Sequence, residues 1–172
     1  MGKISKPHKV KLVAGILSND EEAIDKAGSL LKKLFGKTDL ESALMDFTHS
    51  DYYRDEMGDR LKRKFFSFEK TVSLKDICAA KRKTDRIEKS LSRSGKRVVN
   101  IDPGYIDLSK LVLFSTKDYS HRIYLDRGIY AEVTLFYRGG AFNAWPWTYP
   151  DYKSAEYIGI FNSIRELYKG GA

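Results

Sequence analysis

The chain has 172 residues, of which 42% are hydrophobic and 13% aromatic. This is enough to fold as a single domain over residues 1–172, and it excludes a wholly disordered chain. The 31 Lys and Arg outnumber the 23 Asp and Glu, which gives a net charge of +8. No apolar run approaches the roughly 20 residues of a membrane span, and the N-terminus lacks the pattern of a secretory signal. We therefore expect a cytoplasmic protein with no membrane partner.

Two details of composition add to this. The single cysteine, Cys78, excludes an intramolecular disulfide and a cysteine-based zinc cluster. The chain also contains no glutamine. A composition with few chemically labile residues and many charged ones is typical of heat-adapted proteins. Drift in the composition of the source genome produces the same pattern. Heat adaptation is thus an open expectation, and the sequence specifies no oligomeric state.

The first half of the chain predicts a strand and a helix, then two further strands and a second helix. The apolar run 10–17 predicts a buried strand, and Ser18, Asn19 and Asp20 offer N-cap oxygens for a helix with an apolar stripe from Ile24 to Leu34. Gly36 is a good helix stop. Residues 43–47 and 61–68 predict strands, and residues 73–92 predict an amphipathic helix.

The second half predicts mainly strands. Residues 97–101 form a strand that we expect to stop at a turn made by Asp102, Pro103 and Gly104, and residues 110–115 form the next. A hairpin follows over 121–137, with a three-residue loop at 126–128, and a last helix covers 154–168. The expected facing pairs are Leu125 with Ile129, Ile123 with Ala131, His121 with Val133, Tyr124 with Tyr130, and Arg122 with Glu132.

This order of elements predicts an α+β fold. The first six elements run βαββαβ, which matches a ferredoxin-like core, and an antiparallel β-meander and a C-terminal helix extend it. The alternative is an α/β layered sheet with another strand order.

Four polar clusters fall at expected strand ends and turns, where binding residues gather but where ordinary turn chemistry favours the same residue types. The first holds Asp51, Tyr52, Tyr53 and Arg63, and the second Asn100, Asp102 and Tyr105. The third holds Thr116, Lys117, Asp118, His121 and Arg122, and the fourth is the run 147–152. A phosphate-binding loop of the Gly-x-x-x-x-Gly-Lys-Ser/Thr type is absent, as is Gly-x-Gly-x-x-Gly.

Several segments in order resemble a known family. They are Asp-Tyr-Tyr at 51–53, Met-Gly at 57–58, Asn-Ile-Asp-Pro-Gly-Tyr at 100–105, Thr-Lys-Asp-Tyr-Ser-His-Arg-Ile-Tyr at 116–124, Tyr-Ala-Glu-Val-Thr-Leu at 130–135 and Trp-Thr-Tyr-Pro-Asp-Tyr at 147–152. The sequence is similar to the uncharacterised prokaryotic family described as domain of unknown function 4416. That family has no established activity, and its members often carry the label GTP-binding protein. The resemblance implies nucleotide binding only as a hypothesis, since the motif test finds no phosphate loop.

The first hypothesis is a site for a nucleotide or another anionic small molecule. Lys117, His121 and Arg122 would bind the anion, with Thr116 beside them. Should a reaction take place, His121 is the natural general acid or base, with Asp118 and Lys117 beside it. Asp102 and Glu132 would bind hydroxyls, amines or Mg²⁺. The remaining candidate ligand-binding residues are Asp51, Tyr52, Tyr53, Arg63, Asn100, Tyr105, Tyr124 and Tyr130. The bland alternative is that Arg122 and Glu132 form a cross-strand ion pair and that His121 lies at the edge of the core.

Two other classes of function stay open. Between Arg60 and Arg97 there are 14 basic and four acidic residues, and the rest of the chain is close to neutral. An RNA-binding module would use the cationic face of the helix 73–92, although such a face is more often simply solvated. Its residues would be Lys75, Arg82, Arg86, Lys89 and Arg93. A protein-interaction subunit would use the aromatic run 141–147, although burial of both tryptophans in the core is the simpler interpretation.

Overall fold

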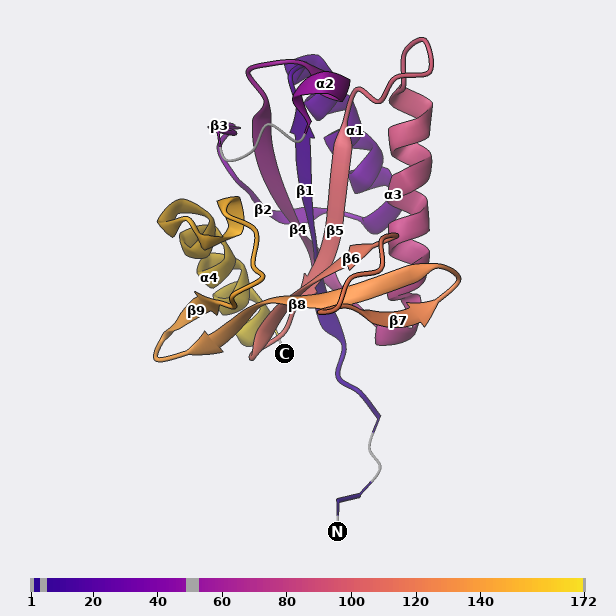
Figure 1. The fold of residues 1–172 in the computed structure, drawn as a ribbon. Helices are drawn as coiled ribbons and strands as arrows, with labels where there is room; N and C mark the ends of the chain where they lie inside the picture. The colour runs from indigo at the N-terminus through magenta and orange to yellow at the C-terminus, as the bar shows by residue number, and fades with distance from the viewer. Residues whose placement is uncertain (1, 4–5, 49–52, 172) are drawn as a thin grey trace.

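The computed structural model describes residues 2–3, 6–48 and 53–171. Figure 1 shows their arrangement as one twisted sheet with helices on both sides. The strands are β1 (Val10–Ser18), β2 (Thr38–Glu41), β3 (Met45–Asp46), β4 (Lys62–Val72), β5 (Asn100–Ile106), β6 (Lys110–Ser115), β7 (Ile123–Asp126), β8 (Ile129–Arg138) and β9 (Ala141–Ala144). The helices are α1 (Glu21–Phe35), α2 (Arg54–Met57), α3 (Ile77–Leu91) and α4 (Ala155–Gly170), with 3₁₀ turns η1 (Leu74–Asp76) and η2 (Asp151–Lys153) before the last two.

The fold class is α+β, as the sequence predicts. Over the described residues the sheet has nine strands, all its pairs are antiparallel, and the main order is β2-β4-β1-β5-β6-β8-β7. β3 adds to β4, and β9 adds to β8. β1 and β2, which α1 connects, are separated in the sheet by β4; β4 and β5, which α3 connects, are separated by β1.

The two faces of the sheet carry different cores. On one face α1 and α3 pack on alternate residues of β1, among them Leu12, Ala14 and Ile16. On the other face α4 packs, through Phe161 and other residues, on a second core that includes Val13. Because side chains alternate along a strand, each residue of β1 belongs to one face or the other. The α4 face is the one that carries the candidate site.

The helix boundaries follow local chemistry. The Asp20 carboxylate accepts a hydrogen bond from the backbone N–H of Ala23 at 3.0 Å, which caps α1 as predicted. Gly36 follows the last turn at φ 96°, a conformation that glycine adopts without strain. Ser154 caps α4 in the same way as Asp20 caps α1, through the N–H of Tyr157.

The strands differ from the expectations in three ways. The predicted turn at Asp102, Pro103 and Gly104 is the middle of β5, where Pro103 lies opposite Ala14 of β1. Gly104 is required there by close packing, since a Cβ at this position would lie 2.3 Å from the carbonyl oxygen of Val112 on β6. β2 is an additional strand between the first helix and the predicted strand 43–47, which is itself only the two residues of β3.

The expected meander is also rearranged. β8, not β7, pairs with β6, and β7 lies at the edge of the sheet. β8 is ten residues long, while β7 has four and leaves Ile123 72% exposed, so the longer and more buried strand takes the inner place. The pairs Ile123 with Ala131 and Tyr124 with Tyr130 are confirmed.

The hairpin loop is shorter than predicted. Asp126 lies opposite Ile129, so the loop is Arg127 and Gly128, both at positive φ, and a bulge takes up Leu125. The expected pairing of Leu125 with Ile129 is therefore wrong. Among the described residues, no helix is long and apolar enough to cross a membrane.

Candidate functional site

A cavity of about 470 Å³ opens on the α4 face of the sheet, beside the segment 147–152 that precedes α4. On β4, β5 and β6 a polar or charged residue of this face lies two positions along the strand from an apolar residue or a glycine. Phe65 is followed on β4 by Arg63, and Leu113 on β6 by Ser115. On β5, Asp102 lies two residues from Gly104. These polar strand ends form the floor of the cavity.

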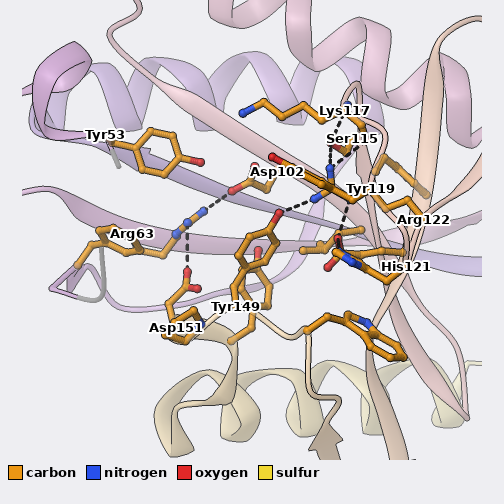
Figure 2. Close-up of a pocket in the computed structure, with 17 residues that line it drawn as sticks. Tyr53, Arg63, Asp102, Ser115, Lys117, Tyr119, His121, Arg122, Tyr149 and Asp151 are labelled. Atoms are coloured by element: carbon orange, nitrogen blue, oxygen red, sulfur yellow. Dashed lines mark hydrogen bonds and ion pairs between the residues drawn. The ribbon is translucent and has the colours of Figure 1, made fainter. Parts of the chain in front are cut away.

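One end of the cavity is a buried arginine with two carboxylates. The Arg63 side chain is 2% exposed, and its Nη1 donates to Oδ2 of Asp102 at 2.8 Å. Its Nη2 lies 3.4 Å from Oδ2 of Asp151, which comes from η2. The guanidinium also lies over the ring of Phe47, at 5.5 Å from its centroid. Figure 2 shows this group on one side of the cavity, with Tyr53 above it.

Gly15 lets this ion pair form. Arg63 is on β4 and Asp102 on β5, and β1 lies between them in the sheet. A Cβ on Gly15 of β1 would lie 3.1 Å from Nη1 of Arg63 and 2.8 Å from the ring of Phe65. The missing side chain therefore leaves the space through which the guanidinium reaches across the central strand.

The other end of the cavity is a second arginine with a different set of partners. Arg122 donates from Nε to Glu132 at 2.9 Å, and its side chain is 3% exposed. Its Nη1 donates to the Ser115 hydroxyl at 2.8 Å and to the Lys117 carbonyl at 2.9 Å. Its Nη2 donates to the Tyr149 hydroxyl at 2.5 Å. Arg122 thus ties β6, β8 and the two loops that border the cavity into one unit.

His121 is held next to this arginine in a stack of rings. Its Nε2 lies 3.3 Å from Oε2 of Glu132, the carboxylate that Arg122 also contacts. The imidazole is parallel to the ring of Tyr119 at 6.0 Å and nearly parallel to that of Trp147 at 5.8 Å. Trp145 stacks on the far side of Trp147 at 5.1 Å. The contact with Glu132 and the stack together fix the plane of the imidazole.

The two carboxylates on Arg63 have pKa values displaced in opposite directions. Burial opposes ionisation of Asp102, but the Arg63 guanidinium outweighs it and the pKa of Asp102 is lowered. For Asp151 burial outweighs the attraction of Arg63, and its pKa is raised. Burial also raises the pKa of Tyr149. Two carboxylates with pKa values pushed apart in one cavity are a recurrent feature of functional sites.

The structure brings together seven of the residues that the sequence singled out. The residues that line the cavity are Tyr53, Arg63, Asp102, Lys117, His121, Arg122 and Glu132. Asn100 supports them from behind, because its side-chain amide donates to Oδ1 of Asp102 at 2.9 Å. The expectation that His121 faces Val133 on the apolar side is wrong, because His121 and Arg122 both precede β7 and both reach Glu132.

Other predicted residues lie elsewhere. Thr116 and Asp118 are exposed and do not line the cavity. Tyr105 is buried on the opposite, α3 side of the sheet. Tyr124 and Tyr130 pack edge to face on the β7–β8 hairpin, away from the cavity lining. Asp51 and Tyr52 lie outside the described residues.

Sequence reasoning missed part of the lining. Ser115, Tyr119 and Tyr149 complete the end around Arg122, and Asp151 and Tyr152 complete the end around Arg63. In the sequence the run 147–152 stands out as a polar and aromatic cluster, but nothing in the run marks Tyr149, Asp151 or Tyr152 as cavity residues. Trp147 is 39% exposed, so the expectation that both tryptophans are buried in the core is wrong.

A metal site finds no support in the arrangement. Among the residues that the structure describes, no three His, Cys, Asp or Glu side chains gather closely enough to hold a metal ion. The two proposed Mg²⁺ ligands are engaged otherwise: Asp102 contacts Arg63 and Asn100, and Glu132 contacts Arg122 and His121. The cavity therefore offers charge pairs and rings in place of a cation cage.

The basic helix lies apart from the cavity. The residues of the cationic surface are Lys75, Arg82, Arg86, Lys89 and Arg93, and none of them lines the cavity. Arg93 is paired with Asp20 at 2.9 Å, which ties the end of α3 to the start of α1. Arg82 is half-buried, whereas Lys75, Arg86 and Lys89 are exposed. One of the five cations is thus neutralised within the fold.

Fold and site together define an α+β protein with an antiparallel sheet and a polar, ring-lined cavity on its α4 face. The chain belongs to the family described as Domain of unknown function (DUF4416), whose model matches residues 8–168. The matched range includes every described residue of the cavity. The comparisons with curated proteins and with solved structures find no match.

Proposed function

We propose that this protein binds, in the cavity on the α4 face, a small molecule that carries a flat ring and an anionic group, such as a nucleotide. The observation that carries the proposal is that aromatic rings and buried charged groups from distant parts of the chain meet around one cavity of about 470 Å³. Ligand pockets of drug-sized and cofactor-sized molecules fall in the range of about 300–1,000 Å³ and combine apolar walls with a few placed polar groups.

Aromatic side chains support the ring part of the proposal. Tyr53, Tyr119, Trp147 and Tyr149 all contribute to the lining. Their faces suit stacking against a planar ring, a contact worth about 1–3 kcal/mol per base in proteins that bind nucleic acids. Tyr119 and Trp147 already form one stack with His121, so a ring added at its edge would extend an existing arrangement.

Lys117 and His121 support the anionic part. Both line the cavity, and Figure 2 shows the Lys117 side chain along its upper side. Arg122 takes a different role from the one first expected, since its Nε and both Nη groups already donate to protein acceptors. We assign Arg122 to holding the loops in place, and Lys117 and His121 to the ligand.

The arrangement also suits proton transfer. Glu132 contacts Nε2 of His121, and Thr134 donates to the other oxygen of Glu132 at 3.2 Å. A carboxylate that orients an imidazole in this way is a common support for a general acid or base. In the proposal His121 is the group that would act on a bound ligand, with Lys117 beside it, whereas the exposed Asp118 has no part.

A thermal-shift screen of the purified protein tests the proposal. The panel contains nucleoside monophosphates and triphosphates with and without Mg²⁺, sugar phosphates and a short RNA, each at low and moderate salt. A ligand that binds only the folded state raises the melting temperature. We expect a nucleotide to raise it for the native protein and for Lys75→Ala, an exposed control outside the cavity, and to raise it much less for Lys117→Ala.

Two results would contradict the proposal. One is a panel in which no small molecule shifts the melting temperature. The other is a shift produced only by RNA that disappears as salt rises, which is typical of phosphate contacts on an exposed basic surface. That second pattern, if lost in an Arg86→Ala/Lys89→Ala variant, would place the function on α3.

We further propose that β2, β4, β1 and β5 with α1 and α3 form a ferredoxin-like core. The support is the interleaved connection of these strands and the packing of both helices on one face. Such a core leaves its second face open, and that is the face with the cavity. A crystal structure superposed on ferredoxin-like domains tests this, and a poor match over these six elements would contradict it.

A further inference from the structure

The two ends of the cavity differ in the balance of charge. At the Arg63 end two carboxylates, Asp102 and Asp151, share one guanidinium. At the Arg122 end the single carboxylate Glu132 is matched by Arg122, and Lys117 adds a further cation. Figure 2 shows the two groups on opposite sides of the cavity with Tyr149 between them. One end is therefore rich in hydrogen-bond acceptors and the other in donors.

The acceptor-rich end is incompletely satisfied by the protein. The contact from Arg63 to Asp151 is 3.4 Å, at the long limit of a hydrogen bond, although Asp151 is 5% exposed. The hydroxyl of Tyr152 is buried at the same end and has no hydrogen-bond partner. A buried hydroxyl without a partner is destabilising, so a ligand N–H that donates to it gains affinity.

A ligand donor suits this end better than a ligand anion. A second anion would meet two carboxylates that already exceed the one guanidinium beside them. An N–H group of a ligand would instead add an attractive partner for Asp151 or Asp102. Burial raises the pKa of Asp151, which means that its ionised form is costly here, and a ligand N–H group would offset part of that cost.

We infer that the ligand binds in one orientation, with an N–H-bearing edge of its ring on Asp151 and Asp102 and its anionic group at Lys117 and His121. This inference rests on the proposed function and names its ligand class: a ring with adjacent N–H donors, as on the edge of an amino-purine. A carboxylate with two oxygens accepts from a ring N–H and an adjacent amino group at once, as in the bidentate pairs that carboxylates form with planar donors.

The experiment compares two nucleotides that differ by one amino group. Guanosine monophosphate carries a ring N–H and an exocyclic amine side by side, and inosine monophosphate lacks only the amine. Calorimetric titration of the native protein with each measures the contribution of that group. We expect guanosine monophosphate to bind at least about tenfold more tightly, since the missing amine leaves one oxygen of a buried carboxylate without its donor.

The variants locate the effect. In Asp151→Asn, whose fold is verified by circular dichroism, we expect the preference to shrink to within about threefold, because an amide presents one acceptor in place of two. Asp118→Asn is the matched control, since Asp118 is exposed outside the cavity, and it should keep the full preference. The comparison of the two nucleotides on the native protein needs no variant and stands even if Asp151→Asn fails to fold.

The outcomes separate this inference from the proposed function. Equal binding of the two nucleotides would overturn the orientation and leave the pocket as a nucleotide site. An unchanged preference in Asp151→Asn would also overturn it. Failure of both to bind, together with every other nucleotide of the screen, would overturn the proposed function itself.

Discussion

The two buried arginines at the ends of the cavity make an instructive comparison. Arg122 is surrounded by acceptors: Nε and Nη2 each donate to one, and Nη1 donates to two. Arg63 is equally buried, but it contacts two carboxylates at unequal distances and leaves Nε without a partner. Two arginine side chains that are equally buried therefore differ in their hydrogen bonding: that of Arg122 is fully satisfied, and that of Arg63 is not.

This difference indicates that one arginine supports the structure of the cavity and that the surroundings of the other take part in binding the ligand. A fully paired guanidinium has little left to offer a ligand, so the Arg122 end fixes the loops that border the cavity. The incomplete set around Arg63 has unmet hydrogen-bonding capacity, and buried groups in that condition suggest a role that the protein alone does not satisfy. The predictions below test this division.

The largest expected effect is on replacing Arg63. Arg63→Met leaves Asp102 and Asp151 buried without their counter-ion, so we expect a loss of about 3–5 kcal/mol in the free energy of unfolding. Urea denaturation measures it, and Arg86→Met on the exposed face of α3 is the control that should change little. A loss in Arg63→Met no greater than that of the control would show that the Arg63 centre contributes nothing to stability.

Replacing Arg122 should cost less, because Glu132 keeps two other partners. In Arg122→Lys we expect a loss of about 2–3 kcal/mol, since an ammonium cannot reach all the acceptors that the guanidinium joins. Hydrogen exchange should become faster in the loop 116–122. The exposed Arg127→Lys serves as the control. Unchanged exchange in the loop would contradict the supporting role of Arg122.

Gly15→Ala tests the path by which Arg63 reaches Asp102. The added methyl group would lie within 3.1 Å of both Nη1 of Arg63 and the Phe65 ring, so we expect a loss of about 1–3 kcal/mol. Gly159→Ala is a matched control on α4, where a Cβ meets nothing within 4 Å. Alanine favours a helix interior over glycine, so the control should gain up to about 1 kcal/mol. A neutral Gly15→Ala would contradict the packing argument.

Glu88 of α3 gives the smallest effect and carries a pH signature. Its carboxylate accepts from the N–H of Ile101 at 2.6 Å, next to Asp102, and burial raises its pKa from 4.5 to about 7. A raised pKa means that the folded state binds the proton more tightly. The associated stability is therefore fully present below about pH 4.5 and is lost as the pH rises through about 7.

The Glu88→Gln variant isolates this term, because the amide keeps an oxygen for the Ile101 N–H and does not titrate. We expect the stability of the native protein relative to Glu88→Gln to fall by about 1–2 kcal/mol between pH 4.5 and 7.5. Melting temperatures of both proteins across this range provide the measurement. A constant difference would mean that Glu88 titrates as an ordinary surface carboxylate.

Many elements of the fold can be predicted from short stretches of the sequence. The apolar run of β1, the Asp20 cap, the Gly36 stop and the stripe of α3 depend on neighbours within one or two turns, and these predictions are confirmed. The strand through Pro103 and Gly104 could not be predicted in this way. The close approach of β6 decides its conformation, and that contact joins segments distant in sequence.

In the candidate site, too, contacts between residues close in sequence could be predicted, and contacts between distant segments could not. Arg122 and Glu132 could be paired because the expected hairpin register places them opposite each other, whereas the same register places His121 on the other side of the hairpin and so does not predict its contact with Glu132. The pairing of Arg63 with Asp151 depends on where α4 docks, and its route over β1 depends on Gly15, so no pattern along the chain reveals either. The sequence favours Tyr124 and Tyr130 of the hairpin as ring-binding residues and does not single out Tyr119. In the structure Tyr119 lines the cavity, whereas Tyr124 lies on the edge strand away from it.

The most direct test uses the two tryptophans, the only ones in the chain. Trp147 lines the cavity and Trp145 stacks on it, so the intrinsic fluorescence of the protein reports on that wall. Guanosine monophosphate is titrated with excitation at the red edge of tryptophan absorption, where the nucleotide does not absorb. The account predicts a saturable change in fluorescence that is weakened in Lys117→Ala and retained in Lys75→Ala. A signal that stays flat, while the same nucleotide raises the melting temperature, would place the binding site elsewhere and contradict the account.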